Sequence, residues 1–67
     1  MSDIEALKAE LKKLSARATN QKMKLHDLSE ELPVDWRRIM TVAQETFDAF
    51  AALEAARERL KALEAAS

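Results

Sequence analysis

Two uninterrupted heptad patterns, one on each side of a single proline, constrain the fold of this chain more than any other feature. Apolar residues recur at alternating spacings of three and four from Ile4 to Leu32, and again from Ile39 to Leu63. Patterns lasting about four heptads favour coiled-coil packing over a loosely amphipathic helix. Pro33 ends the first pattern, because its ring clashes with a continuing helix and disfavours the helical conformation at the preceding residue. The sequence therefore predicts two helices.

Local signals at the helix ends set the expected boundaries of a single domain. The expected ranges are 1–67 for the domain, about 3–31 for the first helix, 32–35 for the turn and about 36–65 for the second helix. Ser2 and Glu5 have the spacing of a capping box, which satisfies two backbone N–H groups at a helix start. After the proline, Asp35 offers a carboxylate as N-cap of the second helix. Val34 and Ile39 stand at the positions of a hydrophobic staple.

The two heptad patterns match one another if the chain folds back at the proline. Residues whose numbers sum to 67 then face each other, so Gln21, the one polar residue of the first pattern, meets Thr46, the one polar residue of the second. A hydrogen bond between them would help to fix the register. The expected hairpin core comprises Leu7, Leu14, Gln21, Leu25, Leu28, Ile39, Val42, Thr46, Leu53 and Leu60. Oppositely charged pairs flank this core: Glu31 with Arg38, Lys24 with Glu45, and Glu10 with Arg59. The predicted fold is an all-α antiparallel helical hairpin.

A second set of apolar residues on the second helix lies outside the core pattern. These residues, which we call the apolar row, are Trp36, Met40, Ala43, Phe47 and Phe50. A two-helix hairpin covers only its core, and exposed aromatic side chains of this size exceed the apolar patch that a monomer tolerates. One interpretation is an antiparallel dimer of hairpins, in which two copies pack as an antiparallel four-helix bundle; the other is a docking surface for a different protein. We favour the homodimer.

Cysteine and histidine content limits the possible chemistry. The chain has no cysteine and one histidine, which excludes disulfides, thiolate metal sites and a zinc site of the usual composition within one chain. His26, with Glu30 one turn on and Asp27 beside it, is half of a metal site that only an oligomer could complete. A surface histidine is the preferred interpretation. No nucleophile with a base and no glycine loop for phosphate is present. We therefore expect no metal, no cofactor and no enzymatic activity.

Charge and hydropathy bear on the partner and the location. With 11 basic and 12 acidic residues, the chain has no global field that would draw it to nucleic acid or to an anionic membrane. Every charged residue between Leu11 and His26 is basic, so Lys12, Arg17 and Lys24 are candidate contacts for RNA or for an acidic partner. A solvated helix face explains them better, because aromatic residues for base stacking are missing. Neither a signal peptide nor a run of ~20 apolar residues is present, so we expect a cytoplasmic protein without a membrane span.

The segment LKKLSARATNQKMKLHDLSEELP, residues 11–33, resembles the small Rop-like family encoded in bacterial nitrogen-fixation gene clusters. The resemblance implies a helical hairpin that dimerises into a four-helix bundle, with a role near nitrogenase or the assembly of its metal cofactor. It also raises an alternative, a Rop-like RNA-binding dimer, although a shared architecture does not transfer function. We expect a non-enzymatic interaction protein, an accessory or regulatory factor that binds nitrogenase or its cofactor-assembly proteins.

Overall fold

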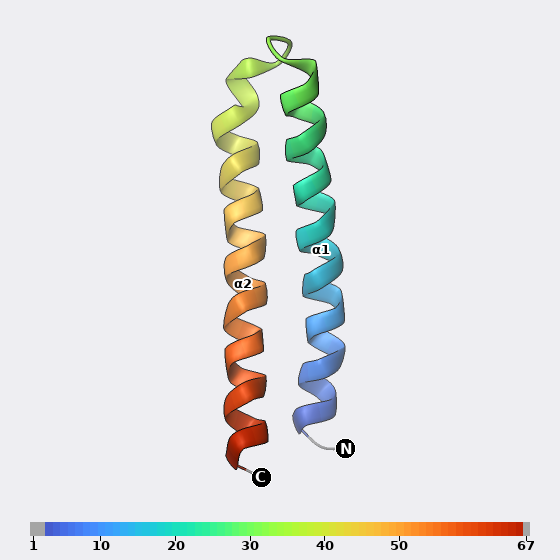
Figure 1. Ribbon diagram of the computed structural model, residues 1–67, viewed down its shortest axis with the longest axis vertical. Helices are drawn as coiled ribbons and strands as arrows, with labels where there is room; N and C mark the ends of the chain where they lie inside the picture. Colours follow the sequence, from blue (N-terminus) through green and yellow to red (C-terminus); the bar gives the residue numbers. More distant parts are fainter. Residues whose placement is uncertain (1–2, 67) are drawn as a thin grey trace.

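The computed structural model describes residues 3–66 and has the form of a single helical hairpin (Figure 1). Helix α1 spans Asp3–Glu31, the 3-10 helix η1 spans Trp36–Arg38, and α2 spans Ile39–Ala66. The two long helices run antiparallel, so the start of α1 and the end of α2 lie at one end, which we call the open end. The predicted all-α hairpin is confirmed.

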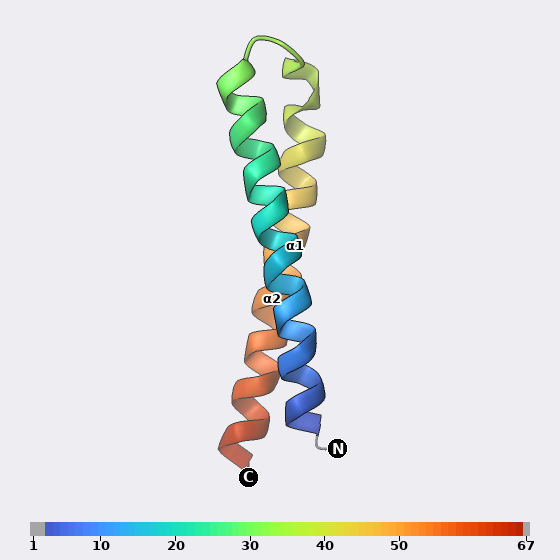
Figure 2. The same ribbon diagram turned by 90° about the vertical axis from the view of Figure 1, so that its right-hand side faces the viewer.

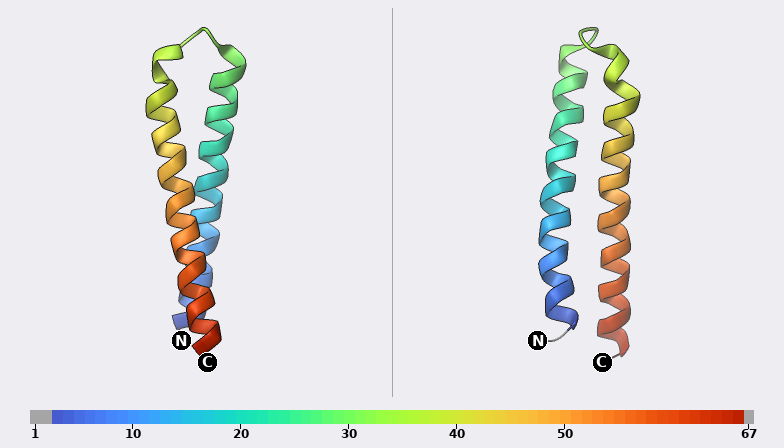
Figure 3. Two further views of the ribbon diagram at one scale, coloured as in Figure 1. Left: turned by 60° about the vertical axis from the view of Figure 1, so that its left-hand side comes forward. Right: turned by 180° about the vertical axis from the view of Figure 1, so that it is seen from behind.

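The hairpin is a rod with extents of 51 × 15 × 13 Å. A side view shows that the helices cross at a shallow angle, which is typical of coiled-coil packing (Figure 2). Views from the other sides show the same two-helix rod, with no further layer in the part of the chain that the structure describes (Figure 3). Neither α1 nor α2 contains the long apolar stretch that a helix needs to cross a bilayer.

The core lies along the seam between the two helices and follows the heptad patterns. The buried residues are Leu7, Ala18, Leu28, Val42, Ala49, Leu53 and Ala56. The remaining predicted core residues are partly buried: Leu14, Gln21, Leu25, Ile39, Thr46 and Leu60. Only the last residues of the two patterns, Leu32 and Leu63, are exposed. Helix spacing of three and four places these side chains on one face, which explains why burial follows the pattern so closely.

Gln21 and Thr46 meet in the middle of the seam, in the predicted register. The Thr46 hydroxyl lies 3.3 Å from the backbone carbonyl oxygen of Gln21 and 2.8 Å from that of Val42, one turn earlier in its own helix. The Gln21 side chain is not its acceptor, and the Gln21 Oε1 atom is buried without a hydrogen-bond partner. The polar layer therefore forms through backbone contacts in place of the expected bond between side chains.

One of the three predicted flanking charge pairs forms an ion pair. Arg59 Nη2 lies 3.9 Å from Glu10 Oε1, and both side chains are more than half exposed. Within residues 3–66, no ion pair joins the other predicted partners, which are Glu31 with Arg38 and Lys24 with Glu45. An exposed pair contributes only about 0–1 kcal/mol. The buried seam, not the charged edge, therefore holds the helices together.

The turn differs from the predicted one in how the second helix begins. The chain leaves α1 after Glu31, whose carbonyl oxygen accepts a bond of 2.9 Å from the Val34 N–H, and the Leu32–Pro33 peptide is cis. A 3-10 turn then precedes α2, because the Arg38 N–H bonds to the Asp35 carbonyl oxygen, three residues back, at 2.9 Å.

The prediction that the Asp35 carboxylate caps the second helix is wrong. Asp35 is left-handed, with φ 57° and ψ 27°, and its side chain makes no capping hydrogen bond. An N-cap residue is usually extended, which points its side-chain oxygen at the free N–H groups of the first turn. The left-handed backbone of Asp35 removes that geometry. Val34, the expected staple residue, is exposed, and the proposed Ser2 cap lies outside the described residues.

Candidate protein-interaction surface

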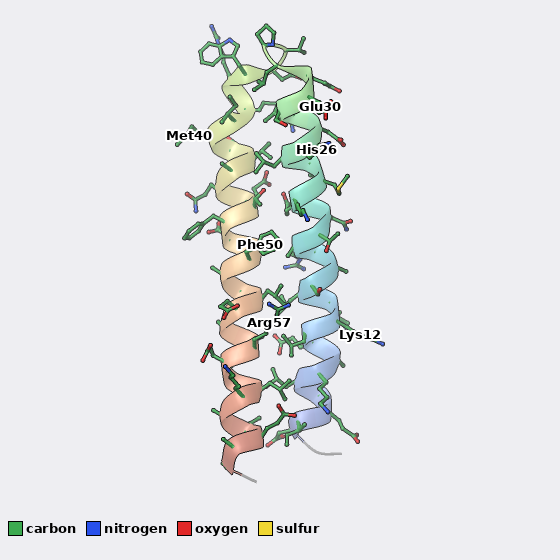
Figure 4. All side chains as sticks on the ribbon, viewed as in Figure 1. Lys12, His26, Glu30, Met40, Phe50 and Arg57 are labelled. Atoms are coloured by element: carbon green, nitrogen blue, oxygen red, sulfur yellow. The ribbon has the colours of Figure 1, made fainter. Side chains whose placement is uncertain are left out.

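The apolar row is the main exposed apolar surface of the hairpin. The exposed fractions are 58% for Trp36, 79% for Met40, 69% for Phe47 and 42% for Phe50, and Ala43 is partly buried. Figure 4 shows Met40 on the side of α2 that faces away from α1, and Phe50 close to the seam. The row therefore runs from the edge of the seam to the outer side of α2.

The apolar row occupies only the half of the rod nearest the turn. From Trp36 to Phe50 a helix rises roughly 20 Å, compared with a rod length of 51 Å. The same helical spacing continued toward the open end places charged, exposed residues in line: Glu54, Arg57, Lys61 and Glu64. Arg57 Nη1 and Glu54 Oε2 are 3.9 Å apart. The surface thus changes from apolar to charged near the middle of the molecule.

Across the seam from the row, α1 presents smaller or polar side chains. In the register that places Gln21 opposite Thr46, Ser29 lies within two residues of the level of Trp36, and Ser15 within two residues of the level of Phe50. All four are exposed. Ser29 Oγ donates a 2.7 Å hydrogen bond to the His26 carbonyl oxygen, which holds the hydroxyl against its own helix. On this face, α2 therefore carries large aromatic side chains at the levels where α1 carries serine.

The Arg37 guanidinium lies over the Trp36 ring at the turn. The Arg37 guanidinium carbon lies 5.4 Å from the centre of the Trp36 ring, which is within cation–π range. Such a contact at an exposed site contributes about 0.5–1 kcal/mol. It orients the indole but leaves more than half of it exposed.

The structure brings together two of the three basic candidates. Arg17 and Lys24 line a shallow hollow on α1 together with Lys13. Lys12 points away from α1 on another side (Figure 4). Asp27 also lines the hollow and offsets part of its positive charge. Lys13 was not among the sequence candidates, although its spacing of four and eleven residues to the other two places it on their helix face.

His26 pairs with Glu30 as a neighbour one turn away. Its Nε2 atom lies 3.2 Å from Glu30 Oε1, and both side chains are exposed. No group of three or more potential metal ligands occurs among residues 3–66.

Sequence reasoning missed a hollow at the open end of the hairpin. Ala6 and Ala62 are too small to cover Leu7 and Leu63, so these leucines line the hollow, with the Glu10–Arg59 pair at its rim. The sequence did contain a signal for this hollow, because an alanine precedes each of the two leucines: Ala6 before Leu7 and Ala62 before Leu63. This hollow lies on the edge of the seam that carries the Glu10–Arg59 pair, opposite the edge next to the apolar row.

Comparison with known proteins places this hairpin in a family. A family profile described as Rop-like matches residues 2–65. A UPF0437 protein of Azorhizobium caulinodans is 65% identical over 65 residues, which cover 97% of this chain and 94% of that protein. A Frankia alni relative, named as a UPF0437 protein in the nifX-nifW intergenic region, is 45% identical over 49 residues, covering 73% of this chain and 60% of the relative.

A solved structure shows the same fold. The NMR structure of a structural-genomics target protein is 50% identical and superposes with a TM-score of 0.85, covering 96% of this chain and 90% of that one. The resemblance to proteins of nitrogen-fixation gene clusters is confirmed by the profile and by the place named for the Frankia relative. This chain belongs to the Rop-like family.

Proposed function

We propose that this chain is a non-enzymatic interaction protein, a homodimer of hairpins that serves as an accessory or regulatory factor for nitrogenase or its cofactor-assembly proteins. The observation that carries the proposal is the exposure of the apolar row on α2. Large apolar side chains that the fold leaves uncovered mark a site of protein association.

A second copy of the chain is the favoured occupant of the apolar row. The four large side chains of the row offer on the order of 500 Å² of apolar surface per copy, given their exposed fractions. Two copies would then bury roughly 1,000 Å², which reaches the lower bound for a specific interface. A chain of 67 residues also has little core of its own and no disulfide to compensate. Dimerisation would supply the missing burial.

The association with nitrogenase rests on family context. The Frankia alni relative is named for the nifX-nifW intergenic region, and the family resemblance points to the same setting. Exposed charged side chains in the open half of α2, among them Glu54, Arg57 and Lys61, would be available to contact a larger protein.

Affinity capture tests the nitrogenase assignment. The tagged full-length chain, incubated with purified nitrogenase components and with purified cofactor-assembly proteins, should retain at least one of them. The tag alone and an unrelated helical hairpin serve as controls. If none of these purified proteins is retained beyond the controls, the assignment to nitrogenase is wrong, whatever the oligomeric state.

RNA binding remains the alternative function, with weaker support. Arg17 and Lys24 share the hollow on α1, but Lys12 lies on another side and Asp27 is within the hollow. A phosphate-binding surface requires an excess of positive charge. Structured RNA at low salt should therefore give no mobility shift, and a salt-dependent shift that Arg17→Glu abolishes would support the RNA function instead.

A further inference from the structure

We infer that the shallow hollow on α1 is a binding site for an acidic amphipathic helix of a partner protein. Its basic side chains are Lys13, Arg17 and Lys24, and we call it the basic hollow. This surface is separate from the apolar row, so the inference goes beyond the proposed function and does not depend on the oligomeric state. It follows from the spacing of the basic residues, their lack of partners within the hairpin, and the apolar side chains beside them.

The three basic side chains of the hollow form a line along α1. Arg17 follows Lys13 by four residues and Lys24 follows Arg17 by seven, and both spacings return to nearly the same side of a helix. At ~1.5 Å per residue, this line is about 16 Å long. A line of positive charge of this length is complementary to a helix that carries carboxylates at the same spacings.

The basic side chains of the hollow have no acidic partner within the hairpin. All three are exposed, and no ion pair within residues 3–66 includes any of them. Asp27 also lines the hollow, three residues beyond Lys24, so three positive charges stand against one negative charge. The guanidinium and ammonium groups are therefore available to pair with the carboxylates of another molecule.

Acidic residues across the seam limit where such a helix could lie. Glu45 and Asp48 of α2 line a second hollow, which they share with Arg17. The Asp48 carboxylate accepts a 2.9 Å hydrogen bond from Gln44 Nε2, on its own helix. Carboxylates on α2 would repel an acidic helix that crossed the seam. The partner helix should therefore lie along α1.

Apolar side chains beside the basic line favour a protein helix over a nucleic acid. Met23 and Ala16 both line the hollow, and Met23 is 49% exposed. A leucine on the partner helix could pack against Met23, whose flexible thioether side chain adapts to such contacts. None of the residues that line the hollow is aromatic, so bases would have no side chain on which to stack.

The basic hollow stays accessible when the apolar row is covered. Arg17 and Lys24 follow Glu10 by seven and fourteen residues, so they lie along the edge of the seam that carries the Glu10–Arg59 pair. The apolar row lies next to the opposite edge. A molecule that covers the row, whether a second copy or another protein, therefore leaves room for a helix in the hollow.

Binding of synthetic peptides to the full-length chain tests the inference. The probe is a fluorescently labelled peptide of about 20 residues, long enough to form a helix, with glutamates spaced by four and seven residues and a leucine on the same face. A peptide with glutamines in place of the glutamates is the reference. Fluorescence anisotropy should show binding of the glutamate peptide only, and this binding should weaken as added salt screens the exposed charges.

Lys13 and Lys12 provide a matched pair of variants. Lys13→Glu reverses a charge inside the basic hollow, whereas Lys12→Glu makes the same change on another side of α1 (Figure 4). Lys13→Glu should weaken peptide binding by about tenfold or more, and Lys12→Glu by much less. Circular dichroism verifies that both variants keep their helix content. Arg17→Gln, which removes one charge of the hollow, replaces Lys13→Glu if that variant does not fold.

Several results would overturn the inference. One is no binding of the glutamate peptide up to about 1 mM, and another is equal binding of the glutamine peptide. Equal weakening by Lys12→Glu and Lys13→Glu would show that the peptide does not bind in the hollow. Tighter binding of a structured RNA hairpin, lost in Lys13→Glu, would assign the hollow to RNA. Each result leaves the homodimer and the nitrogenase assignment standing, because light scattering and affinity capture test those separately.

Discussion

Asp35 shows how one residue sets the geometry of the turn by its backbone. Its left-handed conformation, φ 57° and ψ 27°, is one that aspartate tolerates better than most residues other than glycine. Its carbonyl oxygen accepts the Arg38 N–H, and its carboxylate caps nothing. The conformational tolerance of aspartate, rather than its charge, therefore explains why it suits this position.

Substitution of Asp35 separates these two roles. Serine caps helices as well as aspartate but is less tolerant of the left-handed region. Asp35→Ser should therefore lower the free energy of unfolding by about 1 kcal/mol, whereas Asp35→Gly should leave it unchanged or higher. Thermal and urea unfolding at one protein concentration measure both variants. Equal stability of the serine variant and the wild type would restore the capping role.

Gln21 is the second residue whose substitution should change stability measurably, because its Oε1 atom is buried without a hydrogen-bond partner. An oxygen that is buried without a partner costs about 1–3 kcal/mol. Gln21→Leu removes this atom and restores an apolar side chain to the heptad, so it should raise the free energy of unfolding by about 1 kcal/mol. Urea unfolding measures the change, with Asn20→Leu at an exposed neighbouring position as control. A loss of stability would show that the glutamine side chain has a stabilising partner.

At the scale of the helices, alanine in the core sets how closely they approach. Ala18 and Ala49 face one another in the middle of the seam and are buried, with Leu53 beside them. Small side chains in such a layer allow short distances between helix axes. The aromatic side chains of α2 and Met40 lie outside this narrow seam.

Overpacking this layer should destabilise the hairpin. Ala18→Leu inserts a branched side chain where no space exists, so it should lower the free energy of unfolding by about 1–3 kcal/mol. Ala16→Leu makes the same change at an exposed position of α1 and should have little effect. Chemical unfolding compares the two variants. Equal stabilities would mean that the helices can separate to accommodate the leucine.

At the scale of the whole molecule, the hairpin is a rod whose fold leaves one half of one face apolar. The two helices bury or partly bury the core residues along their seam. The four large side chains of the apolar row nevertheless remain exposed. The isolated hairpin has nothing in residues 3–66 that covers them. The proposed dimer follows from this imbalance.

Phe47→Glu tests the dimer directly. A carboxylate at an exposed position of the apolar row costs little in a monomer but would be buried without a partner in the dimer interface. The variant should behave in light scattering as a single chain, or lose its helix signal in circular dichroism. Ala51→Glu places the same charge on an exposed position of α2 outside the row and should remain dimeric. Dimers of unchanged mass and stability with Phe47→Glu would rule out this interface.

The sequence alone determined the helices, their register and the residues of the seam. Heptad spacing decides which side chains share a face of a helix, and the matched polar residues Gln21 and Thr46 select one register. The apolar row was also predictable, because its spacing places it outside the stripe that one hairpin can cover.

Only the tertiary structure decided the details that depend on backbone geometry and on the distances between helices. The left-handed Asp35 and the 3-10 turn after it arise from how the chain reverses direction, which local preferences for helix caps do not specify. Two features depend on side-chain lengths across the seam. One is the ion pair between Glu10 and Arg59, and the other is the hollow around Leu7 and Leu63. The spacing of residues along one helix determines the side of the helix on which each side chain lies. Whether two side chains on different helices touch also depends on the distance between the helix axes, and the packing of the whole seam sets that distance.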